Sequence, residues 1–181
     1  MSTPLREQYL GIKRRYPDLL VLFQIGDFYE AFDDDARVLA RELDLALTRK
    51  WFGKEDVRPL AGVPVRALDA HLAKLIRRGH RVVVCDQVTP PGKGLVEREV
   101  VRIVTPGTVI EPGLLDGRAN NYLACLVGSG AAAGLAYADV STGEFLVTEV
   151  PWARAQEELE RLAPAEVLVL RGAPLPGRSR P

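Results

Sequence analysis

Residues 20–32, LVLFQIGDFYEAF, are the stretch on which the first half of the fold depends. Side chains of a β-strand alternate between two faces, and the apolar alternation here predicts a single strand over this range. One predicted face is continuously apolar and belongs in a core, and it carries Val21, Phe23 and Ile25. The other face combines an amide, a glycine, an aromatic ring and a carboxylate, and it carries Gln24, Gly26, Phe28 and Glu30.

Phe28 and Glu30 have two interpretations. An aromatic side chain usually closes a small apolar cluster, which is the commoner role for an arbitrary phenylalanine. The alternative is that both side chains project toward a ligand, because the predicted face has no apolar neighbours to receive the ring. On this second interpretation Asp27 and Tyr29 fall on the opposite face and are structural.

The amino-acid sequence of this segment favours the second interpretation. GDFYE at residues 26–30 resembles the mismatch-recognition domain of the MutS family of bacterial DNA mismatch repair proteins. Further blocks follow in that family's order, and they are LTRK at 47–50, PLAGVP at 59–64, CDQ at 85–87, EREVVRIVTPGT at 97–108 and DVSTGEF at 139–145. The resemblance runs from about Pro4 to Leu170, and several blocks in one order are far more specific than any one of them.

The resemblance implies a role for two side chains. In the MutS family the matching phenylalanine stacks on a mismatched base and the matching glutamate hydrogen-bonds that base, so these roles fall to Phe28 and Glu30. An apolar wedge that enters the minor groove and kinks the duplex reads the weak stacking that mismatches share. The partner expected from the resemblance is therefore double-stranded DNA with mismatches or small loops.

Basic residues that could contact phosphates are concentrated in one section of the chain. Net charge is zero overall, but residues 49–102 contain twelve Lys and Arg against six Asp and Glu. Phosphate contacts position a protein on DNA without specifying sequence, so candidates near the wedge are Arg49, Lys50, Lys54, Arg58 and Arg66. Each of them is equally compatible with an ordinary exposed charge.

The order of predicted elements indicates an α/β class. Apolar spacing predicts helices that begin near Pro4, Asp33 and Arg66, alternating with strands at 45–51, 81–87 and 97–105. The resemblance implies a mixed-sheet mismatch-recognition domain with flanking helices over residues 1–108. Residues 109–120, rich in Pro and Gly, are predicted to be a linker. Residues 121–181 resemble an incomplete connector domain of the ribonuclease H-like class, with a three-strand meander, a helix and a fourth strand.

Enzymatic alternatives have little support in the residues. PGKG at 91–94 lacks the GxxxxGK[ST] pattern of a phosphate loop. A metal nuclease needs several converging carboxylates, and the two candidates considered on the predicted meander are Asp139 and Glu144. The acids at 33–35 suit the first turn of a helix better than a metal. The resemblance places ATP and Mg²⁺ in other domains of the full-length family protein, so we expect no cofactor, no metal and no enzymatic activity in this chain.

Partners and location follow from the same comparison. The resemblance implies a homodimer for the full-length family protein and contacts with repair partner proteins through the connector domain. A protein-interaction module that acts through residues 121–181, without DNA binding of its own, is the main alternative function. Cys85 and Cys125 are far apart and are expected to be reduced thiols. The sequence shows neither a signal peptide nor a membrane-spanning run, and the expected location is cytoplasmic and nucleoid-associated.

Overall fold

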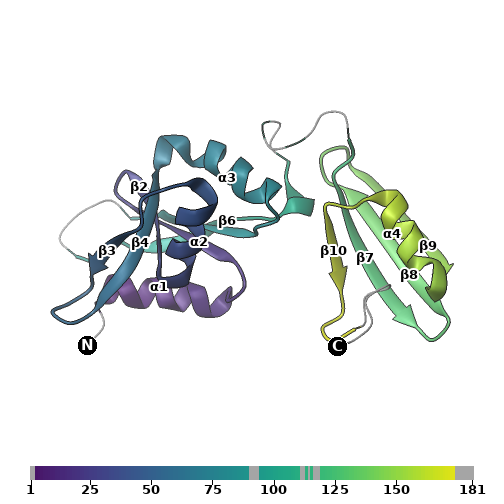
Figure 1. The fold of residues 1–181 in the computed structure, drawn as a ribbon, viewed down its shortest axis with the longest axis horizontal. Coiled ribbons are helices and arrows are strands. Elements are labelled where there is room, and N and C mark those ends of the chain that lie inside the picture. The colour runs from purple at the N-terminus through teal and green to yellow at the C-terminus, as the bar shows by residue number, and fades with distance from the viewer. Residues whose placement is uncertain (1–2, 90–93, 111–112, 114, 116–118, 174–181) are drawn as a thin grey trace. The chain divides into compact units, whose positions relative to one another are not determined.

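A computed structural model describes residues 3–89, 94–110, 113, 115 and 119–173. The chain forms two compact units, Met1–Val104 and Thr105–Pro181 (Figure 1). The division lies four residues before the predicted end of the first domain at 108. The boundary lies before Gly107 because this glycine contacts the second unit, where its amide donates to Glu166 at 3.2 Å. A Cβ at this glycine would meet the side chains of Glu166 and Leu123 at 2.9 Å.

The first unit is built on a six-stranded mixed sheet in the order β3-β4-β2-β1-β5-β6. Its strands are β1 (Leu20–Ile25), β2 (Phe28–Phe32), β3 (Thr48–Trp51), β4 (Val57–Pro64), β5 (Val82–Gln87) and β6 (Arg98–Val104). Among the described strand pairs of this sheet, β1–β5 is parallel and the other four are antiparallel. The sheet is therefore mixed, as predicted.

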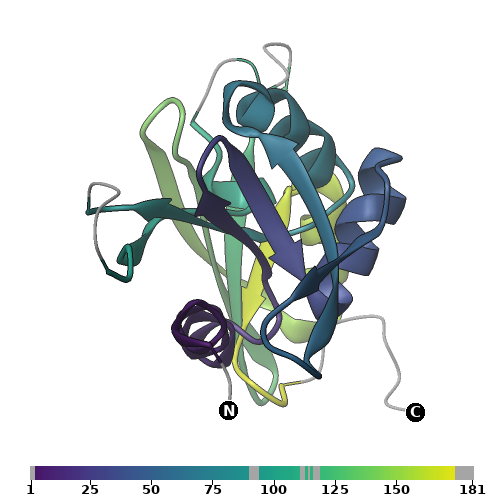
Figure 2. The same cartoon turned by 90° about the vertical axis from the view of Figure 1, so that its left-hand side faces the viewer.

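Three helices flank this sheet, as Figure 2 shows, and they are α1 (Pro4–Arg15), α2 (Asp33–Leu43) and α3 (Leu68–Arg77). Thr3 caps α1 through its side chain, as its position before Pro4 predicts. Helix α1 packs on the face that carries Phe23 and Phe32, in a cluster that includes Tyr9 and Phe52. Helices α2 and α3 contact each other and β4, and they cover the opposite face.

The prediction of one strand over residues 20–32 is wrong, because the chain reverses at Gly26 and Asp27. Strands β1 and β2 form an antiparallel hairpin with the pairs Phe23–Glu30, Gln24–Tyr29 and Ile25–Phe28. Gly26 has φ +58°, the conformation that glycine supplies at the first position of a two-residue hairpin turn.

The reversal changes which side chains share a face. Directly paired residues of an antiparallel hairpin lie on the same face. Glu30 therefore shares a face with Phe23, and Phe28 shares it with Ile25, instead of lying beside Gln24 as predicted. Phe28 nevertheless stays exposed, since it lies at the turn end of β2, whereas Phe32 at the other end of the strand is fully buried in the α1 cluster.

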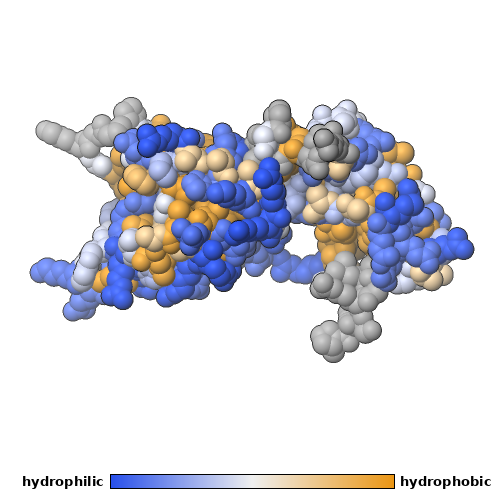
Figure 3. All heavy atoms as spheres, turned by 45° about the horizontal axis from the view of Figure 1, so that its top comes forward, coloured by the Kyte–Doolittle hydropathy of each residue, from blue (hydrophilic) through white to orange (hydrophobic). Residues whose placement is uncertain are grey.

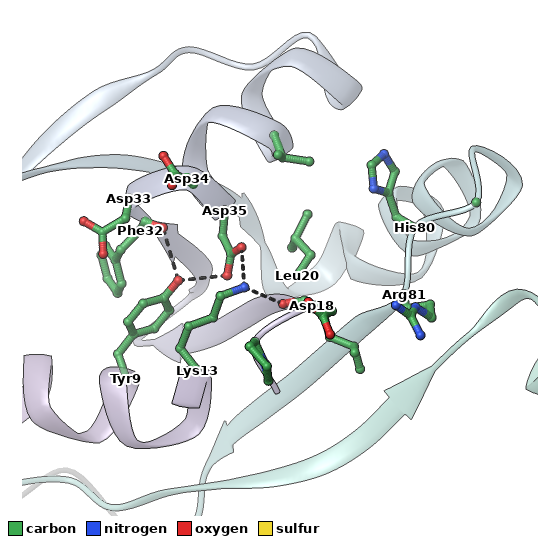
Figure 4. Close-up of a pocket in the computed structure, with 14 residues that line it drawn as sticks. Tyr9, Lys13, Asp18, Leu20, Phe32, Asp33, Asp34, Asp35, His80 and Arg81 are labelled. Atoms are coloured by element: carbon green, nitrogen blue, oxygen red, sulfur yellow. Dashed lines mark hydrogen bonds and ion pairs between the residues drawn. The ribbon is translucent and has the colours of Figure 1, made fainter. Parts of the chain in front are cut away.

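The acidic run at residues 33–35 lies in the first turn of α2, as predicted. The N-cap position is Phe32, which makes no side-chain cap. Asp33 instead pairs with Arg6 of α1 at 2.5 Å. Asp35 is buried and accepts hydrogen bonds from the Tyr9 hydroxyl at 2.9 Å and Lys13 at 2.8 Å (Figure 4). It also accepts from the Val21 amide at 3.1 Å. These carboxylates hold α1 against the sheet.

The second unit contains the predicted meander. Its four-stranded sheet has the order β10-β7-β8-β9, with strands β7 (Tyr122–Ser129), β8 (Ala132–Asp139), β9 (Glu144–Pro151) and β10 (Glu166–Val169). Helix α4 (Ala155–Leu162) packs through Ala155 on one face of this sheet, against Leu126 and Leu135. Apolar residues are visible at the surface of the second unit in Figure 3. The strand register places four exposed apolar side chains on the face opposite α4, and they are Val127, Phe145, Val147 and Leu168.

Candidate nucleic-acid interface

The turn that presents Phe28 is tied to the neighbouring strand β5 by two glutamines. The Gly26 amide donates to the Gln87 side chain at 2.7 Å, and the Gln87 amide donates to the Gln24 side chain at 2.9 Å. The Gln24 amide group also donates to the Gly26 carbonyl at 3.3 Å. The hairpin end is therefore held in place by polar contacts, although it lies outside the core.

Tyr29 anchors the strand from the other face. Its ring is 5% exposed and its hydroxyl donates to Asp86 at 2.6 Å. Burial, and then the hydrogen bond to Asp86, raise the pKa of Tyr29. Tyr29 is thus structural, as the sequence indicates. Asp27 lies exposed in the turn, where its carbonyl accepts from the Val65 amide at 2.9 Å.

Phe28 borders an open hollow at the turn end of β2. Its side chain is 46% exposed. The hollow, of about 520 Å³, is lined by Asp27, Phe28, Pro64, Val65 and Arg66. Pro64 is the cross-strand partner of Phe28, and Val65 is 37% exposed. The ring thus belongs to an apolar rim that ends at a guanidinium group.

Glu30 lies two residues along the same face and is paired with Lys50. The Lys50 ammonium lies 2.5 Å from the carboxylate, and the two side chains are 25% and 17% exposed. The same ammonium lies 5.7 Å from the centre of the Phe32 ring. Gly62 is the cross-strand neighbour of Glu30 on β4. A Cβ at this glycine would approach the Tyr29 carbonyl oxygen to 3.0 Å and the Glu30 side chain to 3.4 Å.

A second cation, Arg98, lies near this carboxylate. Its guanidinium lies over the Phe23 ring at 5.1 Å and donates to the Gln24 carbonyl at 2.5 Å and the Val96 carbonyl at 2.6 Å. Partial burial lowers the pKa of Arg98, and the charge of Glu30 opposes that effect. Glu30 is therefore surrounded by groups that compensate its charge.

The predicted phosphate-contact residues divide into two groups. Lys50 lies beside Glu30, and Arg66 lines the same hollow as Phe28. Of the remaining three, Arg58 is the cross-strand partner of Lys50 and is paired with Asp56, Arg49 alternates with Lys50 and faces away from it, and Lys54 is exposed in the turn. The structure thus brings Glu30 together with Lys50, and Phe28 together with Arg66, while Arg58 lies directly opposite Lys50 on the neighbouring strand.

Sequence reasoning missed the residues that position the site. Gln24, Asp86, Gln87 and Arg98 each contact the hairpin that carries Phe28. The signal was present, since three of them lie in the CDQ block and the block that begins at 97. Their partners could not be named without the strand order.

The acidic residues of the second unit serve its turns. Asp139 is 1% exposed and accepts from the Ser141 hydroxyl at 2.6 Å, the Ser141 amide at 2.9 Å and the Asn121 amide at 2.9 Å. The bond from the Ser141 side chain is the main reason that the pKa of Asp139 is lowered. Glu144 accepts from the Tyr122 hydroxyl at 2.8 Å. Both carboxylates are engaged in local structure.

Other sites considered from the sequence have these positions. Among the described residues no group of three or more His, Cys, Asp or Glu could hold a metal ion. Of the loop at 91–94, residues 91–93 lie outside the described part of the chain. Cys85 is buried, and burial raises the pKa of its thiol to about 12. No helix in the described ranges is both long and apolar enough to cross a membrane.

Comparisons with known proteins agree with these two units. The family model for MutS domain I matches residues 3–112, and that for MutS domain II matches residues 121–174. The DNA mismatch repair protein MutS of Dehalococcoides mccartyi is 52% identical over 169 residues, covering 92% of this chain and 20% of that protein. The protein of the same name from Methanothrix thermoacetophila is 49% identical over 178 residues, covering 97% and 21%. The chain thus spans about a fifth of the length of these relatives.

Proposed function

The chain belongs to the MutS family, and from that premise we propose that its first unit binds mismatched double-stranded DNA with Phe28 as a minor-groove wedge and Glu30 as a hydrogen-bond partner of the displaced base. The observation that supports this most is the half-exposed Phe28 ring on a hairpin end held by Gln24 and Gln87. A ring that serves only the core is not expected in solvent beside an open hollow.

The proposed wedge distinguishes mispaired from matched DNA by how easily the duplex deforms. Separating two stacked base pairs costs a few kcal/mol per step, and less where pairing is already poor. A rigidly held ring therefore enters a mispaired step more readily than a matched one. Pro64 and Val65 extend the apolar surface next to Phe28, which enlarges the contact that the opened step gains.

Glu30 provides a second source of selectivity, beside the lower cost of separating base pairs at a mispair. An ionised carboxylate only accepts hydrogen bonds, and the minor-groove edges of matched pairs offer chiefly acceptors. A rotated or displaced base presents other edges. We therefore assign to Glu30 a favourable contact confined to disturbed pairs, while its negative charge opposes every duplex.

Phosphate contacts complete the site. Arg66 lies next to the proposed wedge and Lys54 is exposed on the neighbouring hairpin, and we assign sequence-independent contacts to both. With few such contacts, binding by this chain alone should be weak, and the slope of log affinity against log salt should be shallow. In the full-length protein we propose a homodimer with separate ATP and Mg²⁺ sites in other domains, acting in the cytoplasm at the nucleoid.

The second unit favours a second candidate function. The exposed apolar face that carries Val127, Phe145, Val147 and Leu168 is of the kind that marks protein contacts. A chain that acts only through this face would be an interaction module without DNA binding of its own.

A binding experiment separates the two functions. We expect the chain to bind a duplex with one mispair more tightly than its matched counterpart, and Phe28→Ala to remove the difference. Phe145→Ala is the matched control, because it removes an aromatic ring that is also exposed, 67% against 46% for Phe28, from the second unit. Equal affinities of the parent for both duplexes, or a loss of preference with Phe145→Ala as well, would contradict the wedge.

A further inference from the structure

The ion pair between Lys50 and Glu30 gives Lys50 a use beyond general attraction to DNA. Lys50 lies on β3 and Glu30 on β2, and strand β4 separates them in the sheet. The ammonium nevertheless lies 2.5 Å from Glu30 Oε2. A side chain that spans a strand to reach one carboxylate oxygen is in a defined conformation, unlike an exposed lysine that samples solvent.

The surroundings of the pair favour this conformation. The Lys50 ammonium passes above the Phe32 ring, at 5.7 Å from its centre, and gains a cation–π attraction there. Gly62 lacks the side chain that would otherwise press on the Glu30 side chain. Both partners are three-quarters or more buried, so water and salt screen them less than an exposed pair.

One oxygen of the carboxylate is left for a ligand. Lys50 contacts Oε2, and among the described residues Oε1 receives no hydrogen bond. Arg98, the other nearby cation, donates to the Gln24 and Val96 carbonyls instead. The pair therefore presents Oε1 as an oriented hydrogen-bond acceptor, while the Lys50 ammonium at Oε2 compensates the negative charge.

On the basis of the proposed function, we propose that Lys50 is a positioning residue for Glu30 that sets mismatch selectivity without itself contacting DNA. Its ammonium fixes Oε2, aims Oε1 at the base edge beside Phe28, and reduces the repulsion between the carboxylate and the phosphates. Without Lys50 the carboxylate is free to rotate and is uncompensated. Matched duplex then meets more repulsion, and mispaired duplex loses the oriented hydrogen bond as well.

An ordinary phosphate contact predicts something different. A lysine that only neutralises phosphate weakens binding uniformly and contributes about one unit of charge to the salt slope. Selectivity, the ratio of the affinities for mispaired and matched duplex, is then unchanged by its removal. The ratio therefore separates the two roles.

The experiment measures both affinities for the complete chain in the parent, Lys50→Met, Lys50→Arg, Glu30→Gln and the double variant Lys50→Met/Glu30→Gln. Methionine keeps most of the apolar stem and removes the charge. We expect Lys50→Met to lower selectivity by about tenfold, the effect of one charge-assisted hydrogen bond. Lys50→Arg should restore most of it. In the Glu30→Gln background Lys50→Met should leave the ratio unchanged, because no carboxylate remains to be positioned.

Lys54→Met is the matched control, since it removes the same charge from the exposed turn of the same hairpin. It should weaken both duplexes by similar factors. A parent without preference for the mispair overturns the proposed function and this inference together. A parent that has the preference, and keeps it with Lys50→Met, overturns this inference alone. So does a Lys50→Met effect on the ratio that persists in the Glu30→Gln background.

Discussion

The Tyr29 hydroxyl donates a hydrogen bond to the Asp86 carboxylate at 2.6 Å, on the face of the sheet opposite Phe28. This bond joins β2 to β5 across the intervening strand β1. Phe28 and Glu30, the residues on either side of Tyr29 in the sequence, are the proposed contacts to DNA. The wedge is therefore held from behind by a buried phenol as well as by the glutamines of the turn.

The Tyr29–Asp86 bond predicts a dependence of stability on alkaline pH. The folded protein holds the phenol neutral, because burial and Asp86 raise its pKa above the ordinary value of 10.0. A raised folded pKa contributes stability that is complete below about pH 10 and is lost as pH rises further. Tyr29→Phe should therefore lose less stability than the parent between pH 9.5 and about 11.

Urea unfolding at several pH values measures this difference. At pH 7 we expect Tyr29→Phe to be less stable by about 1 kcal/mol, the usual net value of one hydrogen bond. Tyr9 is also buried with a raised pKa, so Tyr29→Phe still loses some stability at alkaline pH, as the parent does. Parallel stability curves for the parent and Tyr29→Phe above pH 9 would count against the assignment.

Phe28 and Phe32 offer a matched pair on one face of one strand. Phe28 is 46% exposed and Phe32 is fully buried. Phe32→Ala should cost about 3–5 kcal/mol of unfolding free energy, as core aromatic truncations do. Phe28→Ala should cost only about 1 kcal/mol, because half of the ring area is already in water. Thermal melting decides the point, and a similar drop for both variants would make Phe28 a core residue.

Glu30 is predicted to oppose matched DNA. Glu30→Gln keeps the shape of the side chain, removes the negative charge and leaves Lys50 free to attract phosphate. Matched duplex should then bind more tightly than to the parent, and the preference for a mispair should fall. Affinities for both duplexes, measured side by side in one buffer, provide the test. If Glu30→Gln weakens both equally, Glu30 has no discriminating role.

The sequence predicts most elements of this fold because their signals are local. Thr3 and Pro4 mark the start of α1, and the meander follows from alternating segments separated by glycine turns. The hairpin at Gly26 was missed for a specific reason. Alternation continues on both arms of a two-residue turn, so the periodic pattern looks unbroken while the two arms exchange faces.

The site is predictable only in part. Phe28 and Glu30 follow from the family resemblance, and their roles remain predictions. The Lys50–Glu30 pair depends on the strand order β3-β4-β2, and the Tyr29–Asp86 bond depends on the order β2-β1-β5. Both pairs join residues separated by long stretches of sequence. No local pattern specifies such partners, since each arises only when the sheet assembles.

The carboxylates of Asp33 and Asp35 hold α1 against the sheet. Asp35 is buried and accepts three hydrogen bonds, including those from Tyr9 and Lys13. Its neighbour Asp34 pairs with Arg37 on the surface, and its side chain is 94% exposed. Asp35→Asn should cost about 3 kcal/mol, because Lys13 loses its charge partner and the amide cannot accept from every donor. Asp34→Asn removes the same charge one residue away and should change stability by less than about 0.5 kcal/mol.

Urea unfolding measures the stability of both variants, and amide exchange in α1 locates the effect, since α1 should lose protection only in Asp35→Asn. Equal stabilities of the two variants would show that the acidic run acts only through its charge at the start of α2, as the sequence alone suggested.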